Sequence, residues 1–481
     1  MWCSKDPSFR RQVLVLAGGC CHSISTGIIL AYPSVLNAAI LSPNATEMKA
    51  TVEQASWIAS ATGFAGLLGF FIFCPLFQVI GRKPVNMLFN LTVIIGWIMV
   101  YYSKSITMLI IAKVIQGLAT GGVFVAAVTI NEITHRDKRG VFMTIKKIAM
   151  TTGSLLCHSL ALIWDWRQIA AISWLACFSA LIIVIICPES PAFYAMKGRY
   201  VDCEKSFIWF HGDSSSSERE LKQLISAQKE RISRKQENEK TFKLTKLLKK
   251  LLKRDFIIPF LIASLATIAV DTSGRYFLLG YVTQIMVQLI GDKYIAMYCA
   301  MMADGLIMIA LLISTFVIKT FNRRTILFTF GIASVLLMFV VGLSELVNNS
   351  LSTKVKWVTP LVILLHSFVS TVGLIPAAFT ITTEIFPLEH RGMGSFTTGI
   401  TFTLIYGITM KITPTMIRKT GIGGTYSIFG LCVTFCLTVL YFILPETKDK
   451  TLQEIEDEIK GVERTDVDVE LILLENPKTK T

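Results

Sequence analysis

Twelve apolar runs, each long enough to cross a lipid bilayer as a helix, divide this chain of 481 residues. A helical span needs about 20 apolar residues, because each residue adds about 1.5 Å of length. Only 17% of the residues are charged, against about 25% in a typical soluble chain. The pattern therefore predicts an all-α membrane protein with twelve transmembrane helices. The runs lie near residues 12–38, 54–80, 84–102, 106–133, 141–164, 168–187, 256–288, 294–318, 325–344, 357–386, 394–417 and 424–444.

Lysine and arginine are concentrated in alternate connections between these runs. Loops rich in the two residues stay on the cytoplasmic side of a membrane. With an even number of spans, we expect both termini in the cytoplasm and the protein in the plasma membrane. The opposite connections carry glycosylation sequons at Asn44 and Asn348, on the side where that modification takes place. The basic positions are Arg10, Arg11, Arg82, Lys83, Arg136, Lys138, Arg139, Lys319, Arg323, Arg324 and Arg391, with the stretch 240–254.

The spacing of the runs predicts four segments. These are a first six-helix half at 1–187, a cytoplasmic loop at 188–255, a second six-helix half at 256–444 and a cytoplasmic tail at 445–481. Within the loop, 216–238 and 242–254 have amphipathic helical patterns. We expect them to lie on the membrane and to be held by anionic lipids, in preference to forming a partner-binding module.

Several classes of function are excluded by composition. The net charge of +14 comes from short connections and is not gathered on one face, so we expect no nucleic-acid partner. Most of the eleven cysteines lie inside apolar runs and show no metal-ligand spacing. The sequence contains no nucleophile and base constellation. We therefore expect neither an enzyme nor a bound cofactor or metal.

The two halves repeat one another in sequence. A Glu-x6-Arg-Gly motif follows the fourth span of each half, an arginine pair or Arg-Lys follows the second span, and Pro-Glu-Ser or Pro-Glu-Thr follows the sixth. Three paired features in one order indicate duplication. Parallel six-helix repeats place a solute site between the halves and expose it alternately by rocking. The motifs are Glu132 to Arg139-Gly140 and Glu384 to Arg391-Gly392, Arg82-Lys83 and Arg323-Arg324, and Pro188-Glu189-Ser190 and Pro445-Glu446-Thr447.

These charged motifs are candidates for a gate. Arginine and glutamate at the cytoplasmic helix ends can form charge-assisted hydrogen bonds. We expect the two networks to close the inner mouth when the site faces outward and to break when it faces inward; the alternative is that they only anchor helix ends. The first network contains Arg82, Glu132 and Arg139, and the second contains Arg323, Glu384 and Arg391.

At these motifs the chain resembles the sugar porter family of the major facilitator superfamily. The resemblance runs from the first span to Pro445-Glu446-Thr447-Lys448 and 451–455, and includes Pro188-Glu189-Ser190-Pro191 with Lys197-Gly198-Arg199. Its overall texture is most similar to the insect facilitated trehalose transporters. The resemblance implies the major facilitator fold and transport of a sugar such as trehalose or a hexose.

The positions that contact sugar in that family are largely replaced here. A glutamine of span 5 is Lys147, and the Gln-Gln-x-Ser-Gly-x-Asn motif of span 7 reads Val270 to Tyr276, with Asp271 at its second glutamine. The family's tryptophan of span 10 is Phe379, and the asparagine of its Asn-Trp pair in span 11 is Phe402. Tyr281 matches a gating tyrosine of the family. The resemblance implies a substrate site at Lys147, Asp271, Tyr276, Tyr281, Phe379 and Phe402.

Ionisable residues within spans are costly and need a partner or a function. Asp271 and Arg275 are four residues apart, so on one helix they would form a pair. Lys147 lies about 12 Å along its helix from Arg139, and we expect it to face the cavity and to pair with Asp271 or with an anionic substrate. The other such residues are Lys113, His158, Asp304, His366 and Lys411.

Three functions remain open. The first run contains no Asp or Glu, so it lacks the acid that couples protons in the family's symporters, and we favour a uniporter of a neutral sugar. The second candidate is a carrier of the same fold for a charged or amphiphilic solute. The third is a solute sensor that does not transport. The short tail 445–481 argues against it, because sugar sensors of the resembled fold usually carry long cytoplasmic extensions.

Overall fold

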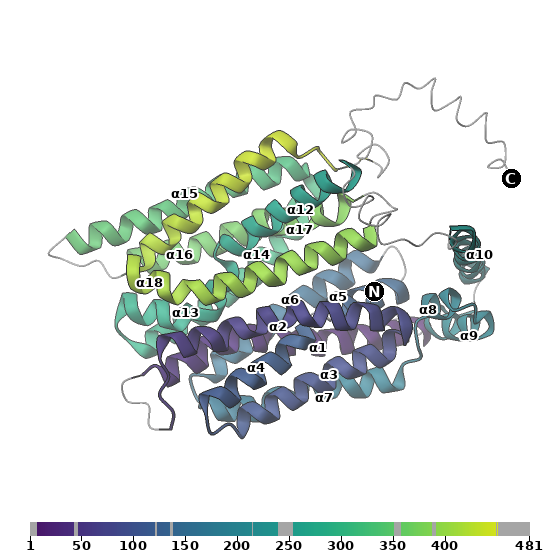
Figure 1. Cartoon of the computed structure of the whole chain (residues 1–481), viewed down its shortest axis with the longest axis horizontal. Coiled ribbons are helices and arrows are strands. Elements are labelled where there is room, and N and C mark those ends of the chain that lie inside the picture. The colour runs from purple at the N-terminus through teal and green to yellow at the C-terminus, as the bar shows by residue number, and fades with distance from the viewer. Residues whose placement is uncertain are drawn as a thin grey trace.

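The chain folds into two helical bundles that lie side by side, with three further helices, α8, α9 and α10, at one end (Figure 1). The computed structural model describes residues 7–42, 47–120, 123–134, 138–213, 215–238, 254–350, 357–386, 391–448 and 450. In Figure 1 the first bundle is purple to blue and the second is teal to yellow. The first bundle contains α1 (Pro7–Ile40), α2 (Val52–Val79), α3 (Arg82–Tyr101), α4 (Ile106–Thr120), α5 (Val123–Ile133), α6 (Arg139–Leu160) and α7 (Trp166–Ile186).

The second bundle has several interrupted helices. It contains α12 (Arg254–Thr272), α13 (Arg275–Ile290), α14 (Lys293–Thr320), α15 (Arg323–Ser350), α16 (Val358–Val369), the π-helical turn η3 (Ser370–Leu374), α17 (Ile375–Glu384) and α18 (Arg391–Ile443). Helix α18 holds two spans, because Gly421 has a left-handed φ of 75° that interrupts it.

The expected twelve-helix architecture is confirmed. Among the described residues, nine helices are long and apolar enough to cross a membrane. One of these is α18, which counts as two spans. The pair α4 and α5 forms another span, and α6 supplies the last, although its three cations lower its hydropathy.

The chain segment that connects the two bundles contains α8 (Pro191–Met196), α9 (Tyr200–His211) and α10 (Ser215–Asn238). Helix α10 was expected from the sequence, whereas α8 and α9 were not; the expected segment 242–254 lies almost wholly outside the described residues. The Arg11 guanidinium donates to the carbonyl of Trp209 at 3.0 Å, so α1 begins beside α9. We call this end of the molecule the near end and the opposite end the far end.

Close helix packing in the first bundle depends on glycine. A Cβ atom at Gly27 of α1 would lie 1.9 Å from the Met150 carbonyl oxygen of α6. In the reciprocal contact, a Cβ atom at Gly153 of α6 would lie 2.0 Å from the Ile24 carbonyl oxygen of α1. Small residues allow two transmembrane backbones to approach in this way. The crossing holds α6, which borders the second bundle, firmly to α1.

Candidate site at the seam between the two halves

An ion pair at the near end of the first half joins α3 to α5. The Arg82 guanidinium donates from Nε to Glu132 Oε2 at 3.0 Å and from Nη2 to Glu132 Oε1 at 2.7 Å. Two parallel charge-assisted bonds of this kind are stronger and more directional than neutral ones. The Ser190 hydroxyl, which follows α7, also donates to Glu132 Oε2 at 2.6 Å. Three separate segments are therefore tied together by one carboxylate.

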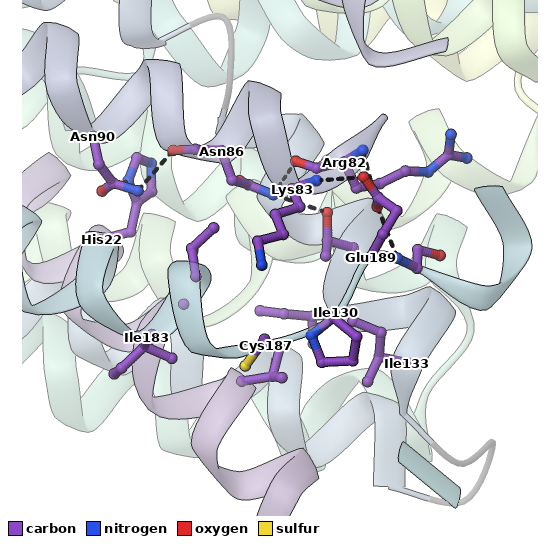
Figure 2. Close-up of a pocket in the computed structure, with 17 residues that line it drawn as sticks. His22, Arg82, Lys83, Asn86, Asn90, Ile130, Ile133, Ile183, Cys187 and Glu189 are labelled. Carbon is purple, nitrogen blue, oxygen red and sulfur yellow. Dashed lines mark hydrogen bonds between the residues drawn. The ribbon is translucent and has the colours of Figure 1, made fainter. Parts of the chain in front are cut away.

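The neighbouring Glu189 caps the start of α3 (Figure 2). Its carboxylate accepts from the backbone N–H of Arg82 at 3.1 Å, of Lys83 at 3.0 Å and of Ser190 at 2.7 Å. The first N–H groups of a helix have no partner within the helix, and its dipole favours an anion there. Burial raises the pKa of the Glu189 carboxyl, and the three N–H donors together with Arg82 oppose that rise.

The second half repeats the helix cap and the hydroxyl bond of this arrangement. Glu446 accepts from the backbone N–H of Arg323 at 3.0 Å and of Arg324 at 3.1 Å, at the start of α15. The Thr447 hydroxyl donates to Glu384 Oε2 at 2.7 Å, as Ser190 does to Glu132. The Arg323 to Glu384 ion pair is looser, with 3.5 Å between Nη2 and Oε1. The sequence repeat thus corresponds to a structural repeat in which the Pro-Glu-Ser/Thr motif caps a helix of its own half.

Two of the expected gate residues do not fit the expected networks. The exposed Arg139 side chain, on the first residue of α6, donates to the Thr134 carbonyl at 3.0 Å instead of reaching Glu132. The expectation that Arg139 joins Arg82 and Glu132 is therefore wrong for this conformation. The side chain of Arg391 lies outside the described residues.

A cavity of about 60 Å³ lies beside the first network (Figure 2). Its wall includes His22 of α1 and Asn90 of α3, whose Nδ1 and Oδ1 atoms are 3.2 Å apart. The cavity is lined by residues of the first half and by 188–190 directly after it, and none of the expected substrate-binding residues lines it. It is therefore not the solute site that the sequence places between the halves.

The expected pair of Asp271 and Arg275 is absent. Helix α12 ends at Thr272 and α13 begins at Arg275, because Gly274 between them has a left-handed φ of 95°. The two side chains consequently do not share a helix face. Asp271 is fully buried, and within the described part of the chain neither of its carboxylate oxygens has a hydrogen-bond partner. In this conformation neither Arg275 nor Lys147 binds it.

Three of the expected substrate-binding residues meet in one aromatic cluster. Tyr276 of α13 packs edge-on against Phe402 and Tyr406 of α18, with ring centroids 5.3 and 5.7 Å apart. Phe379 of α17 packs against Phe402 at 6.1 Å. Asp271 lies near enough to Tyr276 and Tyr406 to interact electrostatically with both. Tyr406 was not expected from the sequence.

The other expected tyrosine lies elsewhere. Tyr281 is 1% exposed and donates its hydroxyl proton to the Met410 carbonyl at 2.8 Å. It therefore fastens α13 to α18 in this conformation and does not line an open space.

Lys147 lies on the face of α6 that is turned toward the second half. Residues 7 and 11 positions apart on a helix share a face, so Lys147 is aligned with Ser154 and His158. Both of these bind Asp304 of α14, in the second half. Lys147 is exposed whereas Ser154 and His158 are buried, so α6 and α14 separate toward the near end.

Polar contacts between the halves gather at the far end. The Ser34 hydroxyl of α1 donates to the Thr283 hydroxyl of α13 at 2.8 Å, and Lys411 of α18 donates to the Ser56 hydroxyl of α2 at 2.9 Å. The third contact is the binding of Asp304 to α6. The far end is therefore closed. The ion pairs at Arg82 and Arg323 are intact nevertheless, and each lies within one half, contrary to the expectation that they break when the opposite end closes.

The two expected glycosylation sites are not described. Asn44 lies outside the described residues, and so does the side chain of Asn348, whose backbone lies in the last turn of α15. Both sites remain predictions.

Comparison with known proteins gives one family and one fold. A family model described as "Sugar (and other) transporter" matches residues 13–459. The facilitated trehalose transporter Tret1 of Drosophila mojavensis is 25% identical over 454 residues, which are 94% of this chain and 51% of that protein. Tret1 of Polypedilum vanderplanki is 24% identical over 456 residues, which are 94% of this chain and 88% of that one. The chain thus spans about half the length of the first of these relatives.

Solved structures give the same fold. The xylose transporter XylE from E. coli, in a partially occluded inward open conformation, matches with a TM-score of 0.73 and 15% identity, over 92% of this chain and 99% of that one. A second structure, of the major facilitator superfamily proton:xylose symporter XylE bound to 6-bromo-6-deoxy-D-glucose, matches with a TM-score of 0.72 and 17% identity, over 94% and 98% of the two chains.

Proposed function

This chain belongs to the sugar (and other) transporter family, and we propose that it is a facilitative carrier of a small sugar that works by alternating access. The observation that carries the proposal is the near-end network, which is repeated in both halves. The network ties the helices of each half to one another, so each half can move as a rigid unit. The two units are joined by polar contacts at the far end of the interface between them, which we call the seam. This arrangement is suited to rocking about a site between the halves.

The sugar proposed is trehalose or a hexose. In its favour, the relatives named above are facilitated trehalose transporters, and XylE is a xylose transporter. We propose uniport because the first span carries no Asp or Glu. The substrate would contact the aromatic cluster of Tyr276, Phe379 and Phe402, with Lys147 toward the near end.

We propose that the near end is cytoplasmic and that the membrane is the plasma membrane. The arginine and lysine residues of both networks, including Arg82 and Arg323, lie at that end, as the positive-inside rule requires. Anionic lipids would hold the basic surface of α10 and the segment after it. On this orientation Arg82, Glu132, Arg323 and Glu384 shape the inner mouth from within each half.

One observation favours a second substrate class. Lys147 and Arg275 both border the seam, and within the described residues neither side chain has a hydrogen-bonded or ion-pair partner. Two cations at the interface between the halves suit a solute with an anionic group, such as a sugar acid. Asp271 is the carboxylate nearest to Arg275 in the sequence, and it is fully buried in this conformation.

Uptake into proteoliposomes of the purified chain tests these proposals. Radiolabelled trehalose or glucose should enter saturably until the inside and outside concentrations are equal, with or without a proton ionophore. Accumulation driven by an imposed pH step would refute uniport. Entry of glucuronate without entry of neutral sugars would replace the sugar proposal by the anionic one, and entry of no solute in either class would refute both.

A further inference from the structure

A buried carboxylate of the second half is held entirely by side chains of the first half. The Asp304 Oδ2 atom of α14 lies 2.6 Å from the Nδ1 atom of His158 on α6. The Ser154 hydroxyl, one turn earlier on α6, donates to Asp304 Oδ1 at 3.0 Å. All three side chains are at most 3% exposed.

The surroundings of this carboxylate offer little other support. Arg275 of α13 faces Asp304 across a small pocket lined by leucine, isoleucine and valine, without hydrogen-bonding to it. Cys157 of α6 is a further titratable neighbour. On α16, the Nε2 atom of His366 lies 2.9 Å from the Ser334 hydroxyl of α15. Among the residues that the structure describes, the two hydrogen bonds from α6 are therefore the contacts that satisfy Asp304.

A carboxylate buried in a protein interior is costly unless it is paired and hydrogen-bonded. Since both partners of Asp304 belong to the opposite half, this compensation exists only while α6 and α14 are in contact at this level. If the halves part here, the carboxylate needs water in place of Ser154 and His158. The contact therefore stabilises the conformation in which the far end is closed. It does not stabilise the fold of either half by itself.

We propose that Ser154, His158 and Asp304 form a clasp that keeps the far end closed and must break for the far side to open. The inference rests on the proposed alternating access and adds the residues that hold one of its two states. The exposure along one face of α6 supports the proposal. Ser154 and His158 are buried on this face, whereas Lys147 is exposed. Along this helix the interface between the halves is thus closed at the clasp and open at Lys147.

A cysteine reporter beside the clasp tests this. Val282 of α13 lines the pocket next to His158 and is 2% exposed, so a Val282→Cys thiol should react slowly with a methanethiosulfonate reagent while the far end is closed. The reaction is followed in lipid nanodiscs, where the reagent reaches both ends. For each variant, the labelling of the same chain without Val282→Cys is subtracted, because opening would also expose native thiols such as Cys157. Added His158→Gln or Asp304→Asn should raise the labelling rate about tenfold or more.

A matched control is the second buried histidine, His366, which is also 2% exposed and bonded to a serine, but within one half. His366→Gln should leave the labelling rate unchanged. A charge exchange, His158→Asp with Asp304→His, should restore slow labelling and so separates loss of the clasp from misfolding. The proposal is overturned if the clasp variants remain monodisperse and label at the parental rate, or if His366→Gln raises the rate equally.

The reporter needs no substrate, so the two proposals fail separately. A chain that opens when the clasp is broken but carries no sugar would refute the proposed function and leave the clasp. A working sugar carrier whose labelling ignores these substitutions would refute the clasp alone.

Discussion

Replacing Glu132 by glutamine should destabilise the chain far more than the same change at Glu384, its counterpart in the repeat. Glu132 receives two bonds of 2.7 and 3.0 Å from Arg82, whose side chain is 8% exposed. Glu384 meets Arg323 at 3.5 Å, and those side chains are 30% and 16% exposed. The two ion pairs have the same sequence origin but differ in geometry and burial.

The expected magnitudes follow from that difference. Removing one partner of a buried ion pair costs about 3–5 kcal/mol, because the other charge is left unpaired. We take the lower end, about 3 kcal/mol, because Arg82 keeps a contact with the Phe77 ring at 4.3 Å and a bond to the Phe77 carbonyl. A longer, partly exposed pair contributes at most about 1 kcal/mol. At roughly 2–4 °C per kcal/mol for a unit of 150–250 residues, Tm should fall by roughly 6–12 °C for Glu132→Gln and by less than about 4 °C for Glu384→Gln.

Thermal denaturation of the detergent-purified variants, followed by tryptophan fluorescence, measures both shifts. Glu218→Gln is a suitable control, because Glu218 forms an exposed pair with Lys222 on α10 and its loss should leave Tm unchanged. Equal shifts for Glu132→Gln and Glu384→Gln, or a larger one for Glu384→Gln, would show that bond geometry and burial do not set the strength of the repeated pair.

Further expectations concern packing, charge and topology. Gly153→Ala should lower Tm by several degrees or prevent folding, since its Cβ would lie 2.0 Å from an α1 carbonyl oxygen, whereas Gly140→Ala, with no atom within 4 Å, should not destabilise the same helix. Lys147→Gln and Asp271→Asn should change the free energy of unfolding additively, to within about 0.5 kcal/mol, because the two side chains are not bonded; a larger coupling would show that they pair. Asn44→Gln should remove a glycan, seen as faster gel migration that glycosidase no longer alters; an unchanged band would contradict the proposed orientation.

The sequence by itself determined the features that depend on local spacing. A span is recognisable from the length of its apolar run, and the halves are recognisable because duplication left paired motifs at equal positions. The pairing of Arg82 with Glu132 could be predicted on the same ground, because both residues stand at helix ends on one side of the membrane. The replacement of the family's sugar contacts, at Lys147 and Asp271, could also be read without coordinates.

Only the tertiary structure decided which distant groups meet. Glu189 caps a helix that starts 107 residues earlier, although the sequence indicated only that its motif is repeated. One left-handed glycine, Gly274, separates Asp271 from Arg275 and removes a pairing that a continuous helix would have made. His158 and Asp304, 146 residues apart, were visible as costly charges within spans. Whether they bind each other depends on which helices are neighbours and on how deep in the membrane each residue lies. Apolar sequences that face lipid carry little information about helix neighbours or about depth.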